Sequence, residues 1–438
     1  MTIAWPIVLS MFSFTLVSFV NAAWVGPLGT SHLAAVGLGT VLLYAVHGFG
    51  IGVLSGLKVG VAQATGEGDI ARTERLAWQG LRLAVWMGIA ELAFVPLGEP
   101  LLRLLGASAD SAPLAGDYFA ARAYGAVPAF IMTALTQYLQ GRGRTVAPMI
   151  AMIIANVVNL VLDPVLIRGL GPFPRLDIAG AGWAASIAFA CGALYLVFVC
   201  RKELLSVTRV FDKKLLARIW ELGLPLGARA TLEVASYLVF QIILAAQGDA
   251  HLAAHVLVVQ TIKWSFLPGY AVSEAVAVLV GQAVGARRLE LVAEIQKAAA
   301  LIAGGFMTLC GVVFVLFPGP LASVFGAAPD VVAIATDVFL VAALFQVFDA
   351  FAMVGLGVLN GAGDTRFVFM AGVGFAWIVK LPIGWYLATE GGLGAVGAWW
   401  GLLAEVLAVW LIVRWRIKSG GWRRAADRAE ALSLAGAF

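Results

Sequence analysis

Residues 331–360 read VVAIATDVFLVAALFQVFDAFAMVGLGVLN, an apolar stretch whose acidic groups are Asp337 and Asp349. A helix needs about 20 mostly apolar residues to cross a bilayer, so this stretch can cross it with a tilt. Eleven further runs meet the same criterion, and together they predict an all-α polytopic membrane protein with twelve transmembrane helices. The twelve runs are residues 5–27, 33–63, 77–98, 115–140, 146–168, 178–200, 217–246, 252–283, 295–317, 331–360, 367–389 and 394–416.

Composition excludes the main alternatives to a membrane protein. Of the 438 residues, 61% are hydrophobic and 12% are charged, whereas soluble domains are about 25% charged. A soluble fold could not hide so much apolar surface, and disordered chains have the opposite composition. The net charge is only +4 without a continuous basic face, so we expect no nucleic-acid partner. The three cysteines lie in apolar runs, and neither a disulfide framework nor a metal site is predicted.

Lys and Arg predict the orientation of the chain, because they are enriched in cytoplasmic connections. Most of the 29 basic residues lie after even-numbered runs and in the C-terminal tail. The connections after odd-numbered runs hold only Arg103, Arg168 and Arg175. Both termini are therefore predicted to be cytoplasmic, and no cleavable signal peptide is expected.

The two halves of the chain are copies of one another. Matching positions run in the same order through both halves, with offsets of 217–220 residues. They include His32 and His251, Gly29 and Gly248, Gly106 and Gly326, Gly141 and Gly361, Thr145 and Thr365, and Gly180 and Gly397. A collinear series of this kind through six helices indicates an internal repeat.

Each half holds six predicted spans, so both copies enter the membrane in the same sense, and parallel repeats are related by an axis along the membrane normal. We therefore predict two six-helix bundles related by a pseudo-two-fold axis, with a cleft that opens to alternate sides, as is typical of a secondary transporter. Walker A, HExxH and GxSxG sequences are missing, which argues against ATP-driven transport and against an enzyme. The predicted parts are an N-terminal lobe (1–205), a basic cytoplasmic linker (206–218), a C-terminal lobe (219–417) and a cytoplasmic tail (418–438).

Several motifs along the chain carry a family resemblance. They are PIVL at 6–9 with SFVN at 18–21, NVVNLVLDP at 156–164, VGQAVGA at 280–286 and GAGDT at 361–365. In this order they resemble the multidrug and toxic compound extrusion (MATE) antiporters, in particular the NorM-like and DinF-like members of the MOP flippase superfamily. The resemblance covers about residues 3–417.

The resemblance implies a V-shaped pair of six-helix lobes that exports amphipathic, often cationic, organic compounds in exchange for H+ or Na+. A small organic substrate, a coupling cation and the bilayer would be its partners, and no cofactor besides the coupling ion is implied. We expect a monomer in the bacterial cytoplasmic (inner) membrane.

Acidic side chains inside predicted spans are the main candidates for a site, because a carboxylate at the bilayer centre costs about 2.5–3.5 kcal/mol on insertion scales. Asp163 follows Asn159 by four residues, so both share one helix face. Together they could hold Na+, or the carboxylate could take up a proton, and the resemblance implies a functional pair. The alternative is a helix-terminal Asp that bonds nearby backbone.

Asn21 stands where family members usually carry Asp. Because Asn cannot titrate, Asn21 could coordinate Na+ or hydrogen-bond Asp163, but it could not carry a proton. The alternative is an ordinary hydrogen bond between helices.

The resemblance also implies a cation-coupling or substrate-binding role for two acids of the second half, Glu233 and Asp349. The alternative is that a salt bridge to Arg229 or Lys263 neutralises them. Arg229 lies one helical turn before Glu233 and would hold the carboxylate ionised.

Glu274 is a secondary candidate in the middle of its run, and Lys380 is expected to pair with a neighbouring acid or to snorkel. The basic groups Arg229, Lys263 and Lys380 keep a second function open. A flippase for a lipid-linked or polyprenyl-linked substrate would need cationic side chains to hold the pyrophosphate.

Overall fold

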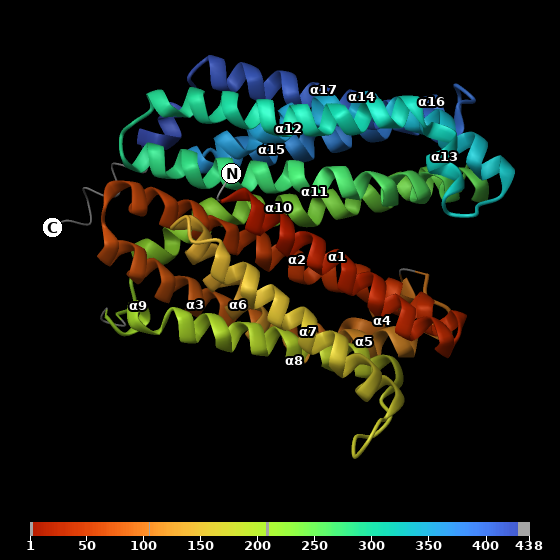
Figure 1. Cartoon of the computed structure of the whole chain (residues 1–438), viewed down its shortest axis with the longest axis horizontal. Coiled ribbons are helices and arrows are strands. Elements are labelled where there is room, and N and C mark those ends of the chain that lie inside the picture. Colours follow the sequence, from red (N-terminus) through yellow and green to blue (C-terminus); the bar gives the residue numbers. More distant parts are fainter. Residues whose placement is uncertain (1–2, 105, 207–209, 428–438) are drawn as a thin grey trace. The chain divides into compact units, whose positions relative to one another are not determined.

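The computed structural model describes residues 3–104, 106–206 and 210–427, without the side chains of residues 14–23 and 30. In this part of the chain every regular element is a helix (Figure 1). The chain forms two compact units, Met1–Thr231 and Leu232–Phe438.

The N-terminal unit is built from long helices joined by short turns. Its elements are α1 (Ala4–Val25), η1 (Gly26–Leu28), α2 (Thr30–Glu67), α3 (Ile70–Leu92), η2 (Val95–Leu97), α4 (Gly98–Leu104), α5 (Ser111–Tyr124), α6 (Ala126–Gly141), α7 (Val146–Arg168), α8 (Asp177–Val199), α9 (Arg201–Leu205) and the first part of α10 (Lys213–Ala245).

The C-terminal unit repeats this plan, in the green-to-blue part of Figure 1. Its elements are the rest of α10, α11 (Asp249–Gly285), α12 (Glu290–Leu316), α13 (Pro318–Ser323), α14 (Pro329–Ala362), α15 (Thr365–Phe375), the π-helix η3 (Ala376–Lys380), α16 (Leu381–Ala388) and α17 (Gly394–Lys418).

The predicted spans are confirmed as helices. Over the described residues, ten helices are long and apolar enough to cross a membrane, and α5 with α6 makes an eleventh span that is bent by 53°. α1 is the twelfth, with an apolar described part at its start. The bend lies at Gly125, which packs directly against Ser186 of α8 and has no room for a side chain.

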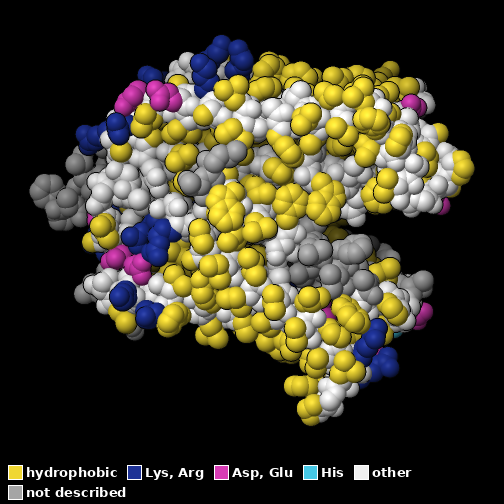
Figure 2. Space-filling view, in the orientation of Figure 1, with side chains coloured by type: hydrophobic (Ala, Val, Ile, Leu, Met, Phe, Trp, Pro, Cys, Tyr) yellow, Lys and Arg dark blue, Asp and Glu magenta, His cyan; other side chains and the backbone are white. Residues whose placement is uncertain are grey.

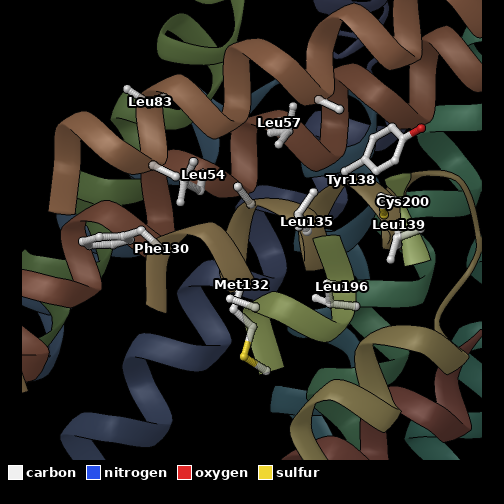
Figure 3. Close-up of a cluster of buried hydrophobic side chains, with 14 of the residues drawn as sticks. Leu54, Leu57, Leu83, Phe130, Met132, Leu135, Tyr138, Leu139, Leu196 and Cys200 are labelled. Atoms are coloured by element: carbon white, nitrogen blue, oxygen red, sulfur yellow. The ribbon is translucent and has the colours of Figure 1, made fainter. Parts of the chain in front are cut away.

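The core of the N-terminal unit forms around α2, which packs against α3, α5 and α6. Figure 3 shows Leu54 and Leu57 of α2 near Leu135 and Tyr138 of α6, all fully or nearly fully buried. Ile219 of α10 belongs to the same buried cluster. The two compact units meet inside α10, between Thr231 and Leu232. The lobe bounds given by the sequence stay predictions.

The core of the C-terminal unit forms around α14, which packs against α11, α12 and α17. Ala335, Val338, Phe339 and Ala342 of α14 are fully buried. Their spacing of three and four residues follows one face of a helix, so the pattern in the sequence predicts which side of α14 is buried.

The repeat is preserved in backbone contacts between helices. A Cβ at Gly180 would lie 2.6 Å from the carbonyl oxygen of Leu166, and one at Gly397 would lie 2.5 Å from that of Leu387. Both glycines therefore allow the same close approach of two helices, which no other residue permits without a shift.

Candidate functional site

Asp163 and Asn159 form a buried polar pair on α7. Asp163 is fully buried, Asn159 is 3% exposed, and the Asn159 amide donates a hydrogen bond of 3.1 Å to the Asp163 carboxylate. Pro164 lies inside α7 and has no N–H, so the carbonyl of Leu160 lacks its usual helical donor. One turn of α7 thus holds a carboxylate, an amide and a backbone carbonyl, and oxygen ligands of this kind suit a hard cation.

Asn21 lies on α1, but its side chain is outside the described residues. α1 packs against α7, and Asn156 of α7 donates a hydrogen bond to Ser13 of α1. The helix that carries Asn21 is therefore a neighbour of the helix that carries Asp163. The role of Asn21 stays a prediction.

Glu233 and Asp349 lie on different helices of the C-terminal unit, α10 and α14. Asp349 is 8% exposed, and Glu233 is half-buried. Arg229, also half-buried, lies one turn before Glu233 on α10. Asp349 is therefore the more deeply buried of the two predicted acids.

A buried ammonium group lies next to the turn that carries Glu233. Lys380 donates a hydrogen bond of 2.9 Å to Ser236, and its Nζ lies 3.4 Å from a carboxylate oxygen of Glu405. Ser236 in turn donates to the backbone carbonyl of Glu233 at 2.9 Å. The expectation that Lys380 pairs with an acid is confirmed, and the network joins η3, α17 and α10.

The local backbone explains how Lys380 reaches this position. It is the last residue of η3, a single π-helical turn, and Pro382 follows in the first turn of α16. π-Turns re-aim side chains within a helix and are frequent at functional sites. The irregular turn thus brings a basic group into the interior of the unit.

The secondary candidates Lys263 and Glu274 both lie on α11. Lys263 is exposed and donates a hydrogen bond of 2.7 Å to Gln260 on the same helix, and Glu274 is half-buried. Among the described residues, no group of three or more His, Cys, Asp and Glu side chains is placed to hold a metal ion.

Sequence reasoning missed a second polar pair in the N-terminal unit. His47 Nδ1 of α2 lies 2.9 Å from Glu91 Oε2 of α3, with Glu91 3% exposed, and Phe130 stacks on the imidazole at 4.1 Å. The repeat positions in the second half are Phe266 and Cys310, so the fold does not require this pair. A histidine and an acid in neighbouring spans were the available signal.

Comparison with known proteins decides the family. The family model MatE matches residues 6–165 and again residues 225–386, once in each half. The chain belongs to the MatE family. The predicted resemblance is confirmed, and the double match agrees with the internal repeat.

Relatives match this MatE protein over nearly its whole length. It is 31% identical over 412 residues to a probable multidrug resistance protein NorM of Deinococcus radiodurans, covering 92% of this chain and 90% of the relative. It is 27% identical over 412 residues to a probable multidrug resistance protein NorM of Pseudomonas syringae pv. tomato, covering 91% of this chain and 90% of the relative.

Solved structures share the fold. An outward-facing multidrug resistance MATE family transporter of the MOP superfamily superposes with a TM-score of 0.86 at 21% identity, covering 98% of this chain and 95% of the other. A MOP superfamily transporter from Pyrococcus furiosus, described as having a binding pocket of reversed polarity, gives 0.87 at 20% identity, covering 99% and 95%. The predicted all-α fold of twelve transmembrane helices is therefore confirmed.

Proposed function

We propose that this MatE protein exports amphipathic, often cationic, organic compounds in exchange for H+ or Na+ by alternating access. The observation that carries the proposal is Asp163, a fully buried carboxylate paired with Asn159 inside a membrane-spanning helix. An ionised carboxylate is costly at this depth unless a cation or proton compensates it. Relatives along nearly the whole chain are multidrug resistance proteins, which supports export as the use of such a site.

The coupling ion supplies the driving force in this proposal. Each positive charge that enters across about 100 mV contributes roughly 2.3 kcal/mol. Asp163 and Asn159, with Asn21, form the proposed N-terminal cation site, and Glu233 and Asp349 form the C-terminal site for the ion or a cationic substrate. Coupling requires that ion and substrate bind the two orientations with different affinities.

We further infer that the protein acts as a monomer in the bacterial cytoplasmic membrane, with both termini in the cytoplasm. The bacterial origin of the NorM relatives supports the membrane, and the distribution of Lys and Arg supports the orientation. The substrate is a small organic compound rather than a nucleic acid or a protein.

Dye efflux from proteoliposomes under an imposed inward H+ or Na+ gradient tests the proposal. We expect Asp163→Asn, Glu233→Gln and Asp349→Asn each to slow gradient-driven efflux at least tenfold. Glu99→Gln is the matched control, because Glu99 is 43% exposed and pairs with Arg103 along the same short helix, α4. Wild-type rates in all three site variants would defeat the assignment.

A flippase for a lipid-linked or polyprenyl-linked substrate is the second candidate, and the buried Lys380 favours it. A pyrophosphate needs cationic partners inside the protein. Translocation of a fluorescent polyprenyl pyrophosphate in proteoliposomes, lost in Lys380→Met, would support the flippase. Dye efflux without such translocation supports the exporter.

A further inference from the structure

A groove of about 320 Å³ opens between α12, α14 and α17 of the C-terminal unit. Apolar side chains form most of its wall, and Gly355 of α14 packs so closely on α17 that a Cβ would lie 2.5 Å from a methyl group of Val413. The floor of the groove is therefore closed by two helices in direct contact. Its lining residues include Ala293, Ala300, Phe351, Val354, Trp410 and Ile417.

The charged groups of the groove are all positive. Lys297 of α12 and Arg414 of α17 both line it, and Gln296 adds an amide. None of its lining residues in the described part of the chain is acidic, and neither basic group forms an ion pair there. The Arg414 guanidinium lies 5.6 Å from the ring centre of Trp410, which orients it. The groove is thus complementary to an anion.

The surroundings of the groove are apolar, as expected for a surface that faces lipid. Further along α12, Leu301 is 72% exposed and Leu309 is 62% exposed, and Leu411 of α17 is 56% exposed. On the face drawn in Figure 2, hydrophobic side chains are spread over the C-terminal unit, and Lys and Arg gather with a few Asp and Glu at one of its ends. Lys297 and Arg414 lie near the start of α12 and the end of α17, so the groove lies near a charged end of the unit, while the charged side chains that line it are basic.

We propose that this groove binds one anionic phospholipid, with its phosphate between Lys297 and Arg414 and its acyl chains along the apolar surface of α12. Basic pockets between transmembrane helices on the cytoplasmic side of a membrane suit phosphate head groups, and the proposed orientation places this end of α12 and α17 on that side. The corresponding positions of the first half are Trp78 and Val197, so the basic pair is not part of the repeat. The site belongs to the C-terminal unit alone and is independent of the transported substrate.

Native mass spectrometry of the whole protein in detergent tests the proposal with dioleoyl phosphatidylglycerol as probe and dioleoyl phosphatidylcholine as the zwitterionic comparison. We expect one tightly retained phosphatidylglycerol. Lys297→Gln and Arg414→Gln should each weaken its binding about fivefold, and the double variant about 25-fold. Lys418→Gln removes a charge from the end of the same helix without touching the groove, and it should leave the binding unchanged.

Three results would overturn the proposal. They are equal retention of phosphatidylcholine, equal weakening by Lys418→Gln, and displacement of the lipid by glycerol 3-phosphate at equal concentration, which would assign the groove to a free phosphate. Size-exclusion elution and the melting temperature check that each variant is folded. Since the side chains of Lys297 and Arg414 are both exposed, we expect the elution volumes and melting temperatures of the variants to match those of the wild type.

Discussion

The two units keep the same close helix contacts but carry opposite charges at one corresponding turn. In the N-terminal unit Arg144 pairs with Glu203 at 2.7 Å. At the corresponding turn, 220 residues later, Asp364 pairs with Arg416 at 2.9 Å. The turn residue is thus basic in one unit and acidic in the other, and each pairs with a side chain of opposite charge. The repeat retains the close contacts of the backbone, whereas the charges differ because either member of an ion pair can stand at the helix end.

The same contrast is found inside the units. In the N-terminal unit Asp163 on α7 is paired with an amide, and in the C-terminal unit Lys380 of η3 is paired with Glu405. The N-terminal unit therefore holds a buried acid beside a neutral amide, and the C-terminal unit holds a buried ion pair in addition to the buried acid Asp349. The two copies of the fold thus differ in their buried charged groups.

The largest loss of stability is expected when the buried ammonium group of Lys380 loses its acidic partner Glu405. Glu405→Gln leaves Lys380 buried with Ser236, and breaking a buried pair costs about 3–5 kcal/mol. Asn159→Ala should cost less, because Asp163 can protonate instead. The melting temperature of each variant in detergent measures the two losses of stability. The double variant Lys380→Met/Glu405→Leu should recover most of the loss, and a double variant as unstable as Glu405→Gln would refute the pairing.

The shared helix contacts should respond equally in both units. A Cβ at Gly141 would lie 2.8 Å from the Lys58 carbonyl, and a Cβ at Gly361 would meet the Ala277 carbonyl. Gly141→Ala and Gly361→Ala should each cost about 1–3 kcal/mol through overpacking. Gly305→Ala is the control, since nothing lies within 4 Å of that position. A loss of stability in only one of these two variants would show that the two helix contacts are not equivalent.

The two ion pairs should differ in strength. Asp364→Asn removes a carboxylate that is 6% exposed and should cost about 1–2 kcal/mol, because Arg416 is left half-buried. Arg144→Gln should cost less than about 1 kcal/mol, since Arg144 is 47% exposed and solvent screens it. Arg142, 3.8 Å from Glu203, also remains. Equal losses in the two melting temperatures would contradict this order.

The smallest expected effect is a pH dependence of the stability of the fold that arises from Glu203, a residue outside the membrane-spanning helices. Burial opposes its ionisation, but hydrogen bonds from its own backbone and from Arg144, with the charge of Arg142, hold its pKa below the usual value. Glu203 therefore stabilises the fold above the unfolded pKa of about 4.3, and this contribution is lost as the pH falls through the folded pKa. The stability difference between wild type and Glu203→Gln should stay constant from pH 7 to about pH 5 and shrink as the pH is lowered further, through about 4 towards about 3. A stability difference that grows as the pH falls would contradict this prediction.

Sequence was sufficient for those features that depend on one helix at a time. The apolar runs predicted the spans, and a spacing of four residues predicted that Asp163 and Asn159 share a face. Contacts between helices were less accessible, because hydropathy does not fix how far each helix is rotated about its axis. The partner of Lys380 lies 25 residues away on another helix, and His47 with Glu91 was missed for the same reason.

Cation movement that accompanies substrate export tests the central claim most directly. In proteoliposomes loaded with a fluorescent cationic dye, an inward H+ or Na+ gradient should drive dye out while the cation enters. Asp163→Asn should abolish both movements. Dye export with no cation entry, or cation entry that is unchanged in Asp163→Asn, would contradict the account.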